Sequence, residues 1–286
     1  MWEYIVGLLA LLRAFQGIRF FLIKRRVRGP VPIVSEAKPF FKKVPGQKVA
    51  LLLHGFTSSP KEFRDLSNYL AKNGMSSYAP LLPGHGTSPE RLAVMSYYHW
   101  VESVEEQISM LAQDYNEIYL IGNSFGGNLA LICAQYSPKI KGVVTLGTPM
   151  FFRRDKVRRF VFFPILRRIK LFQAKKYKTP FAKKLMTEKA WSYQSMPLRS
   201  LSQLLKLLSL TKKSLPKIKK PLLVMQVDKD HLVDPESSNY IISKSASKYK
   251  KIITIPESYH MFLIDKYAYL VHKEILDFIE NKYKSL

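Results

Sequence analysis

The stretch Gly122-Asn123-Ser124-Phe125-Gly126 decides how the rest of the sequence is interpreted. It follows four strand-like residues at 118–121 and precedes a helical run of small residues at 127–134. Glycines two positions before and after the serine permit a turn tight enough to hold the serine in a strained backbone conformation. The serine hydroxyl is then exposed at the top of a sheet. In this strand, turn and helix context the pattern predicts a nucleophile elbow with Ser124 as its reactive group.

Strand and helix patterns alternate on both sides of this turn. Strands are expected at 49–53, 76–79, 118–121, 142–147, 222–227 and 251–255, with a short edge strand at 38–41. Helices are expected at 61–73, 97–115, 127–134, 235–247 and 270–283. Continuous apolar runs such as 49–53 are typical of parallel strands that are covered on both faces. The alternation therefore predicts an α/β fold, in which helices flank a mostly parallel central sheet.

The alternation stops between residues 150 and 215. This segment is basic and aromatic, with helical patches such as 200–210 but no convincing strand. It lies after one predicted core strand and before the next, so we interpret it as a helical insertion. The predicted organisation is an N-terminal segment at 1–28, a first part of the core at 29–149, the insertion at 150–215 and a second part of the core at 216–286.

The formal net charge of +25 is unevenly distributed along the chain. Residues 1–50 contain ten Lys or Arg and two acids, residues 151–220 contain twenty-one and two, and the remainder contains fifteen and seventeen. The excess is therefore +8 and +19 in the two segments and −2 elsewhere. A nearly neutral core with two basic attachments indicates an anionic surface as partner. No recognised nucleic-acid-binding motif accompanies the charge, so we do not expect nucleic acid to be that partner.

Residues 1–23 are mostly apolar and aromatic, and the basic run 24–28 follows them. As a helix this stretch would be about 34 Å long, enough to span a bilayer. Arg13 and Arg19 within it also fit a helix that lies in the interface, so both arrangements stay open. A signal peptide would carry its positive charge before the apolar run, whereas here Glu3 precedes it. We therefore expect a membrane-associated protein with a retained N-terminal anchor and its catalytic part on the cytoplasmic side.

Two residues that could activate Ser124 follow it in the sequence. A serine hydroxyl needs an adjacent general base, usually a histidine that a carboxylate orients. Asp230 lies in the loop after the strand expected at 222–227, and His260 lies in the loop after the strand expected at 251–255. The order Ser, Asp, His, with each residue following a strand, is that of an α/β-hydrolase catalytic triad.

These motifs together resemble those of the bacterial carboxylesterase and monoacylglycerol lipase branch of the α/β-hydrolases. The resemblance extends from about Lys38 to the C-terminus and rests on His54-Gly55-Phe56, Pro83-Gly84-His85-Gly86, the elbow, Asp230 and His260. It implies the α/β-hydrolase fold, with residues 150–215 as a cap over the active site. It also implies a serine carboxylic-ester hydrolase in which Ser124 is the nucleophile, His260 moves the proton and Asp230 orients His260.

Asp228 and Asp234 compete with Asp230 as the acid. In the family the acid is followed three positions later by an aliphatic residue and soon by a proline, as Val233 and Pro235 follow Asp230. Asp234 instead fits the cap of a helix that begins at Pro235. The resemblance therefore favours Asp230.

Acyl transfer also needs two hydrogen-bond donors for the tetrahedral oxyanion. Position assigns them to the backbone N–H of Phe125, next after the nucleophile, and of Phe56, in the loop after the first long strand. His54 and His85 are expected to order their loops. No cluster of metal ligands and no phosphate-binding loop stands out in the sequence, so we expect no cofactor and no metal.

The expected substrate is a small acyl ester, which includes lipids such as a monoacylglycerol. We expect the enzyme to bind it at a membrane surface. The insertion interleaves arginine with bulky apolar residues, as in Phe151-Phe152-Arg153-Arg154 and over 158–169, which suits an anionic lipid surface. A lysophospholipase or thioesterase with the same triad is the alternative among enzymes. A non-catalytic, membrane-associated scaffold with a hydrolase fold is the alternative from another class. The preferred acyl chain, the alcohol and the oligomeric state do not follow from the sequence.

Overall fold

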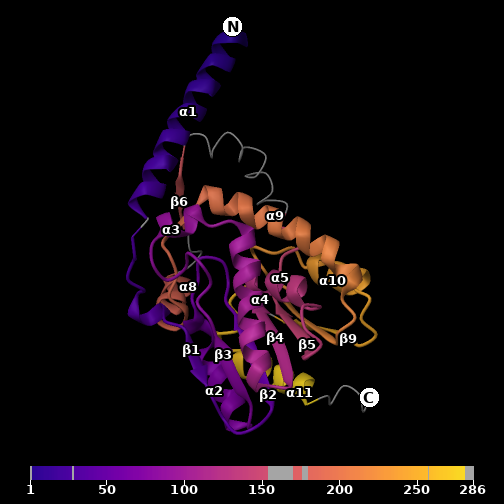
Figure 1. The fold of residues 1–286 in the computed structure, drawn as a ribbon. Coiled ribbons are helices and arrows are strands. Elements are labelled where there is room, and N and C mark those ends of the chain that lie inside the picture. Colours follow the sequence, from indigo (N-terminus) through magenta and orange to yellow (C-terminus); the bar gives the residue numbers. More distant parts are fainter. Residues whose placement is uncertain (1, 28, 154–169, 176–179, 257, 281–286) are drawn as a thin grey trace.

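The computed structural model describes residues 2–27, 29–153, 170–175, 180–256 and 258–280. Its centre is a seven-stranded sheet with the strand order β1-β3-β2-β4-β5-β8-β9 (Figure 1). The strands are β1 (Phe40–Lys42), β2 (Lys48–Leu53), β3 (Ser76–Ala79), β4 (Glu117–Asn123), β5 (Ile140–Leu146), β8 (Leu222–Val227) and β9 (Lys250–Ile255). Only the edge strand β1 runs antiparallel to its neighbour within this sheet. The predicted mostly parallel sheet is confirmed.

Helices cover both faces of the sheet, as predicted. One face carries α2 (Arg64–Lys72) and α11 (Ala268–Ile279), and the other carries α4 (Tyr97–Asp114), α5 (Phe125–Cys133), α9 (Leu198–Ser214) and α10 (Glu236–Lys244). Side chains along β2 alternate between these two cores: Leu51 and Leu53 pack with the α4 and α5 side, and Ala50 and Leu52 pack with the α2 and α11 side. This alternation explains why the strand is apolar at every position from 49 to 53.

The segment 150–215 contains strands as well as helices. Its described helical parts are α8 (Pro180–Leu185), a π-helical turn (Met186–Ala190) and α9. It also contains a two-stranded antiparallel sheet of β6 (Phe172–Ala174) and β7 (Ser195–Pro197), so the expectation of no strand was wrong. Strands of three residues are too short to show the alternating pattern by which a strand is recognised. Arg154 and the basic, aromatic stretch 158–169, which we expect to suit an anionic lipid surface, lie outside the described residues.

The N-terminal stretch forms a helix, α1 (Trp2–Arg26), that projects from the end of the molecule where α9 lies (Figure 1). The guanidinium of Arg199, in α9, lies 3.9 Å from the centre of the Phe20 ring. Val27, which follows the helix, is buried. Large apolar side chains are exposed along the helix at Trp2, Tyr4, Val6, Leu11, Phe15, Ile18, Phe21 and Leu22. In the part of the chain that the structure describes, no helix is both long enough and apolar enough to cross a membrane.

The turn between β4 and α5 packs directly against the end of β2. A Cβ atom on Gly126 would lie 1.9 Å from the carbonyl oxygen of Leu53, and a Cβ atom on Gly122 would lie 2.3 Å from the carbonyl carbon of Gly126. Both obstacles are backbone atoms, which cannot rotate away as a side chain could. Glycine is therefore required at these two positions by the close approach of neighbouring backbone.

We expect Gly126→Ala to lower the free energy of unfolding by ~3 kcal/mol, because the new methyl group forces β2 and α5 apart. Urea denaturation followed by circular dichroism measures the change. Gly29→Ala is the matched control, since a Cβ atom there meets nothing within 4 Å. Equal midpoints for the two variants would contradict the steric account.

Candidate active site

Ser124 occupies a strained backbone conformation at the junction of β4 and α5. Its φ and ψ are 51° and −113°, in a region that residues with a side chain rarely adopt. Two hydrogen bonds hold the turn: the Ser124 N–H donates to the Leu146 carbonyl at 2.7 Å, and the Gly127 N–H donates to the Ser124 carbonyl at 3.0 Å. This is the geometry that the elbow pattern predicts.

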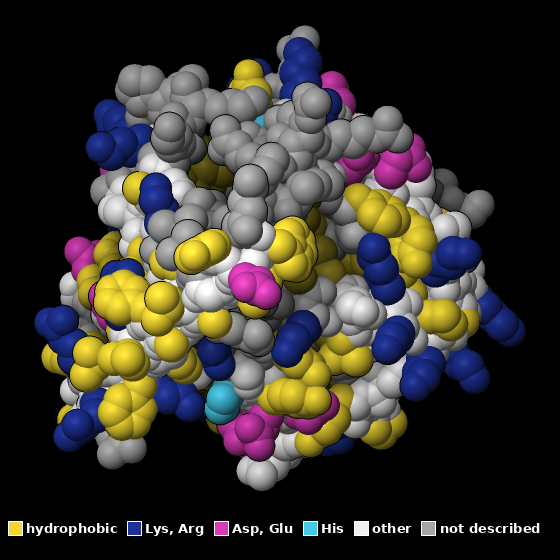
Figure 2. Space-filling model, turned by 90° about the horizontal axis from the view of Figure 1, so that it is seen from above, with side chains coloured by type: hydrophobic (Ala, Val, Ile, Leu, Met, Phe, Trp, Pro, Cys, Tyr) yellow, Lys and Arg dark blue, Asp and Glu magenta, His cyan; other side chains and the backbone are white. Residues whose placement is uncertain are grey.

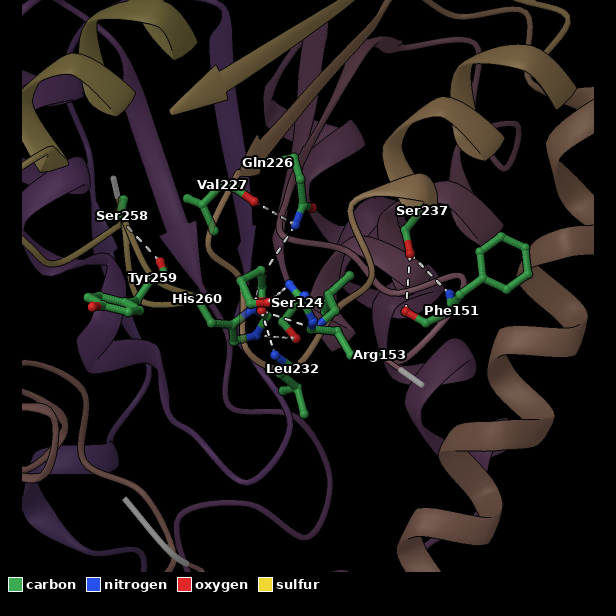
Figure 3. A network of polar contacts seen from close by, with 12 residues as sticks. Ser124, Phe151, Arg153, Gln226, Val227, Leu232, Ser237, Ser258, Tyr259 and His260 are labelled. Carbon is green, nitrogen blue, oxygen red and sulfur yellow. Dashed lines mark hydrogen bonds and ion pairs between the residues drawn. The ribbon is translucent and has the colours of Figure 1, made fainter. Parts of the chain in front are cut away.

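The structure brings Ser124, His260 and Asp230 together although 136 positions separate Ser124 from His260. They lie in the loops that follow β4, β9 and β8, so all three stand at the carboxyl ends of parallel strands. The Ser124 Oγ lies 3.0 Å from His260 Nε2, and His260 Nδ1 lies 2.7 Å from Asp230 Oδ2. Figure 3 shows Ser124 and His260 side by side at the centre of this polar network.

The Asp230 carboxylate is fully buried and saturated with hydrogen bonds. Its Oδ1 accepts from the backbone N–H groups of Leu232 at 2.8 Å and Val233 at 3.0 Å. Its Oδ2 accepts from His260 Nδ1 and from the side-chain amide of Gln226 at 3.3 Å (Figure 3). The loop after β8 therefore fixes which way this carboxylate faces, and it faces His260.

The electrostatics of the pair favour a charged His260 beside a charged Asp230. Burial by itself would raise the pKa of the Asp230 carboxyl, but the adjacent imidazole and the backbone hydrogen bonds bring that pKa below its ordinary value. Burial by itself would lower the pKa of His260, but the Asp230 carboxylate and the more distant Glu62 raise it above its ordinary value. An imidazolium at position 260 would thus be stabilised by its surroundings.

The two competing acids do not contact His260 in this arrangement. Asp228 has an exposed side chain just past the end of β8. Asp234 accepts a hydrogen bond from the Glu236 N–H at 3.1 Å, at the start of α10. Asp234 thus lies where the sequence suggested a helix cap, and Asp230 is the acid placed against the histidine.

Phe56 and Phe125 lie next to each other at the ends of the neighbouring strands β2 and β4. Their ring centres are 5.6 Å apart. Phe125 is the first residue of α5, and the N–H groups in the first turn of a helix have no acceptor within the helix. Its ring is buried and packs edge-on against Trp100 at 5.0 Å, so the Phe125 side chain is a core aromatic.

His54 and His85 order the loops around Phe56. The Leu82 N–H donates to His54 Nε2 at 3.1 Å, so the proton of this imidazole is on Nδ1, which donates to the Gly55 carbonyl at 3.0 Å. Burial lowers the pKa of His54 to about 4, which keeps the ring neutral. His85 is also buried, and its ring centre lies 4.8 Å from that of His54. The structure therefore gives both histidines a positional role.

The sequence analysis did not place three residues at this site, although it assigned one of them, Arg153, to a lipid-facing run. Gln226 donates to Asp230, and its position as the polar residue of an apolar strand was a signal that could have identified it. The guanidinium of Arg153 donates to the Asp230 backbone carbonyl at 2.9 Å, a contact across 77 positions that no local pattern indicates. Glu62, the third, is buried behind the loop that contains Phe56.

The remaining histidines and acids do not assemble into a metal site within the described ranges, where no group of three or more His, Cys, Asp or Glu side chains could hold an ion. His99 accepts from the Ser96 N–H at 3.0 Å at the start of α4. His272 is buried in α11, where desolvation lowers its pKa to about 4. The absence of a cofactor stays a prediction from the sequence.

Comparison with known proteins agrees with this geometry. The family model described as serine aminopeptidase, S33, matches residues 45–267. The chain is 32% identical over 247 residues to a thermostable monoacylglycerol lipase of Bacillus sp. (strain H-257), covering 86% of this chain and 96% of that protein. It is 30% identical over 249 residues to a carboxylesterase of Bacillus subtilis (strain 168), covering 87% and 98%.

A solved structure of the monoacylglycerol lipase of Paleococcus ferrophilus has the same fold. It superposes with a TM-score of 0.72 at 22% identity and covers 84% of this chain and 96% of the other. At this identity the likeness concerns the fold alone, whereas the family match covers most of the sequence. The chain therefore belongs to the serine aminopeptidase S33 family of α/β-hydrolases, in the branch that contains the bacterial carboxylesterases and monoacylglycerol lipases.

Proposed function

We propose that this serine ester hydrolase cleaves carboxylic esters through an acyl-enzyme intermediate on Ser124, with His260 as general base and Asp230 as the acid that orients it. One observation carries the proposal: contacts of 3.0 and 2.7 Å connect Ser124 Oγ through His260 to Asp230 Oδ2. Both distances lie in the range within which a proton can be transferred or an imidazole oriented.

The reaction follows from these contacts. Ser124 Oγ attacks the ester carbonyl carbon while its proton moves to His260 Nε2, and the carbonyl oxygen becomes an oxyanion. We assign the two donors to this oxyanion to the backbone N–H groups of Phe56 and Phe125. Collapse of the intermediate breaks the bond to the alcohol, which leaves with the proton from His260. Water, deprotonated by His260, then releases the acid and restores Ser124.

For the substrate we propose a monoacylglycerol or a similar ester with one acyl chain. The support is the names of the two Bacillus relatives, a monoacylglycerol lipase and a carboxylesterase, each matched over nearly its full length. A lysophospholipid or an acyl thioester could be cleaved by the same three residues, so both are tested in the same assays.

We further propose that the enzyme acts against an anionic membrane on the cytoplasmic side. The supporting features are the exposed apolar side chains of α1 and the three basic residues of its last turn, Lys24, Arg25 and Arg26. On the face seen from above, hydrophobic side chains lie among Lys and Arg (Figure 2). A surface that combines both kinds of side chain suits the boundary between acyl chains and anionic headgroups.

A fluorophosphonate probe should label the wild-type protein and leave Ser124→Ala unlabelled, because only an activated serine attacks the phosphorus. The same variant should lose essentially all hydrolysis of p-nitrophenyl esters and monoacylglycerols. Lysophospholipids and acyl thioesters should be assayed beside these substrates, so that the leaving groups can be ranked by kcat/KM. A wild-type protein that neither labels nor hydrolyses any of these would leave the non-catalytic scaffold as the better account.

Asp230→Asn should lower kcat by about 10⁴-fold, because the amide no longer holds His260 with its proton on Nδ1. Steady-state kinetics on a soluble p-nitrophenyl ester measure the loss. Asp228→Asn is the matched control, since Asp228 is exposed and two positions away, and it should keep kcat within about twofold of wild type. A large loss in Asp228→Asn with none in Asp230→Asn would reverse the assignment.

Reversing three charges, Lys24→Glu, Arg25→Glu and Arg26→Glu together, should weaken binding to vesicles that contain phosphatidylserine. Each basic residue near an anionic surface contributes on the order of 1 kcal/mol, and added salt should reduce wild-type binding in the same way. Vesicle co-sedimentation measures the bound fraction.

The matched control for this triple variant makes the same change in net charge away from α1, at the exposed residues Lys72, Lys244 and Lys248. It should bind nearly as the wild type does. Equal binding of the wild type to neutral phosphatidylcholine vesicles would contradict an electrostatic role for these residues.

A further inference from the structure

Apart from raising the pKa of His260, the buried carboxyl of Glu62 has no role in the reaction described above. Glu62 lies in the 3₁₀ turn Pro60–Phe63 that follows the Phe56 loop, and only 5% of its surface is exposed. Burying a carboxylate is unfavourable unless hydrogen bonds replace the water that it loses. The partners that replace this water therefore indicate what the residue does.

The two carboxylate oxygens of Glu62 have different partners. Oε2 accepts from the Ser58 hydroxyl at 2.5 Å, within the same loop. Oε1 accepts from the backbone N–H of Gly55 at 2.8 Å and from the side-chain amide of Asn123 at 2.9 Å. One oxygen atom thus joins the loop after β2 to the residue that precedes Ser124 in the elbow.

Gly55 and Asn123, the two partners of Glu62 Oε1, lie within two positions of the residues that we assign to the oxyanion. Gly55 immediately precedes Phe56, and Asn123 lies two positions before Phe125. The bridge through Glu62 therefore connects the peptides next to both backbone N–H groups that we assign to the oxyanion. At Gly55 a Cβ atom would lie 3.7 Å from both the Asn123 amide nitrogen and Glu62 Oε1, so the three groups are closely packed.

The Asn123 side chain depends on this bridge for its orientation. Its Oδ1 is buried and, among the described residues, has no hydrogen-bond partner. The hydrogen bond from its nitrogen to Glu62 is thus the polar contact that holds the amide. An apolar residue at position 62 would leave the partly buried Asn123 amide and the Gly55 N–H without this acceptor.

We propose that Glu62 is a positioning residue, which sets the distance between the Phe56 and Phe125 backbone N–H groups by holding the loop after β2 against the nucleophile elbow. This inference rests on the proposed function, because it assigns those two N–H groups to the oxyanion. A donor aimed at the oxyanion acts mainly in the transition state, so its displacement lowers kcat more than it changes KM.

Three variants at positions 62 and 123 separate the effect of the hydrogen-bonded bridge on kcat from the effects of side-chain charge and packing. Glu62→Ala removes the bridge and should lower kcat on a p-nitrophenyl ester by ~10²-fold, with KM within about twofold of wild type. Glu62→Gln keeps one oxygen for Gly55 and Asn123, while its NH₂ group can donate to the Ser58 hydroxyl. It should therefore restore kcat to within ~10-fold of wild type. Asn123→Ala breaks only the elbow side of the bridge and should lower kcat by ~10-fold.

Ser67→Ala is the matched control for loss of a buried hydrogen bond. Ser67 lies in α2, five positions after Glu62, and its hydroxyl contacts that of Ser77 at 2.7 Å, away from Ser124. This variant should lose stability, measured by urea denaturation, without a change in kcat. A fall in kcat in Ser67→Ala as large as that in Glu62→Ala would show that general destabilisation, and not positioning, explains the effect.

The double variant Glu62→Ala with Asn123→Ala completes the test. If both residues act through one bridge, adding Asn123→Ala to Glu62→Ala should lower kcat no further, whereas independent effects would multiply and overturn the inference. A Glu62→Ala protein with kcat within twofold of wild type would also overturn it. If Glu62→Ala does not fold, Glu62→Gln and Asn123→Ala decide: unchanged kcat in Asn123→Ala overturns the inference, and a ~10-fold fall supports it. Turnover by the wild type tests the proposed function separately.

Discussion

The backbone of Ser124 is the constraint on which the rest of the structure depends. A residue with a side chain held at φ 51° costs on the order of 1 to 3 kcal/mol, and such a conformation persists only when its surroundings fix it from several sides. Here β5 fixes it through the carbonyl of Leu146, and β2 fixes it through the close approach of Gly126 to Leu53. The central strands thus do more than form a core, because their spacing sets the direction in which the serine hydroxyl faces.

Two buried carboxylates near this turn make comparable sets of contacts. Asp230 accepts two backbone N–H groups of its own loop and uses its other oxygen on His260. Glu62 accepts one hydroxyl of its own loop and uses its other oxygen on Gly55 and Asn123. In each case one oxygen fixes the carboxylate locally and the second holds a distant segment. Because both groups are buried, a misplaced donor would leave a carboxyl oxygen without a hydrogen-bond partner, and the arrangement resists small displacements.

The parts of this site that could be predicted from the sequence are those that follow a strand. Ser124, Asp230 and His260 each lie in the loop that follows a predicted strand, and parallel strands bring their carboxyl ends to one edge of the sheet. Glu62 reads in the sequence as an ordinary acid in the first turn of a helix, since its partner Asn123 is 61 positions away. Arg153 and the β6 and β7 pair were missed for the same reason: long-range contacts and three-residue strands leave no periodic pattern. Gln226 was also missed, but it had a local signal, because it is a polar residue within an apolar strand.

The loop after β2 is held from the opposite direction as well. The Tyr193 N–H, in the segment 150–215, donates to the Thr57 carbonyl at 3.0 Å, and the Ser59 hydroxyl donates to the Ala190 carbonyl at 2.6 Å. Phe56 therefore lies in a loop that is attached both to Glu62 and to the insertion. Donors that stabilise a developing charge are most effective when they need no rearrangement during the reaction. A loop fixed by two separate parts of the chain meets that requirement, and it supports the proposal that the backbone N–H of Phe56, not its side chain, is a donor to the oxyanion.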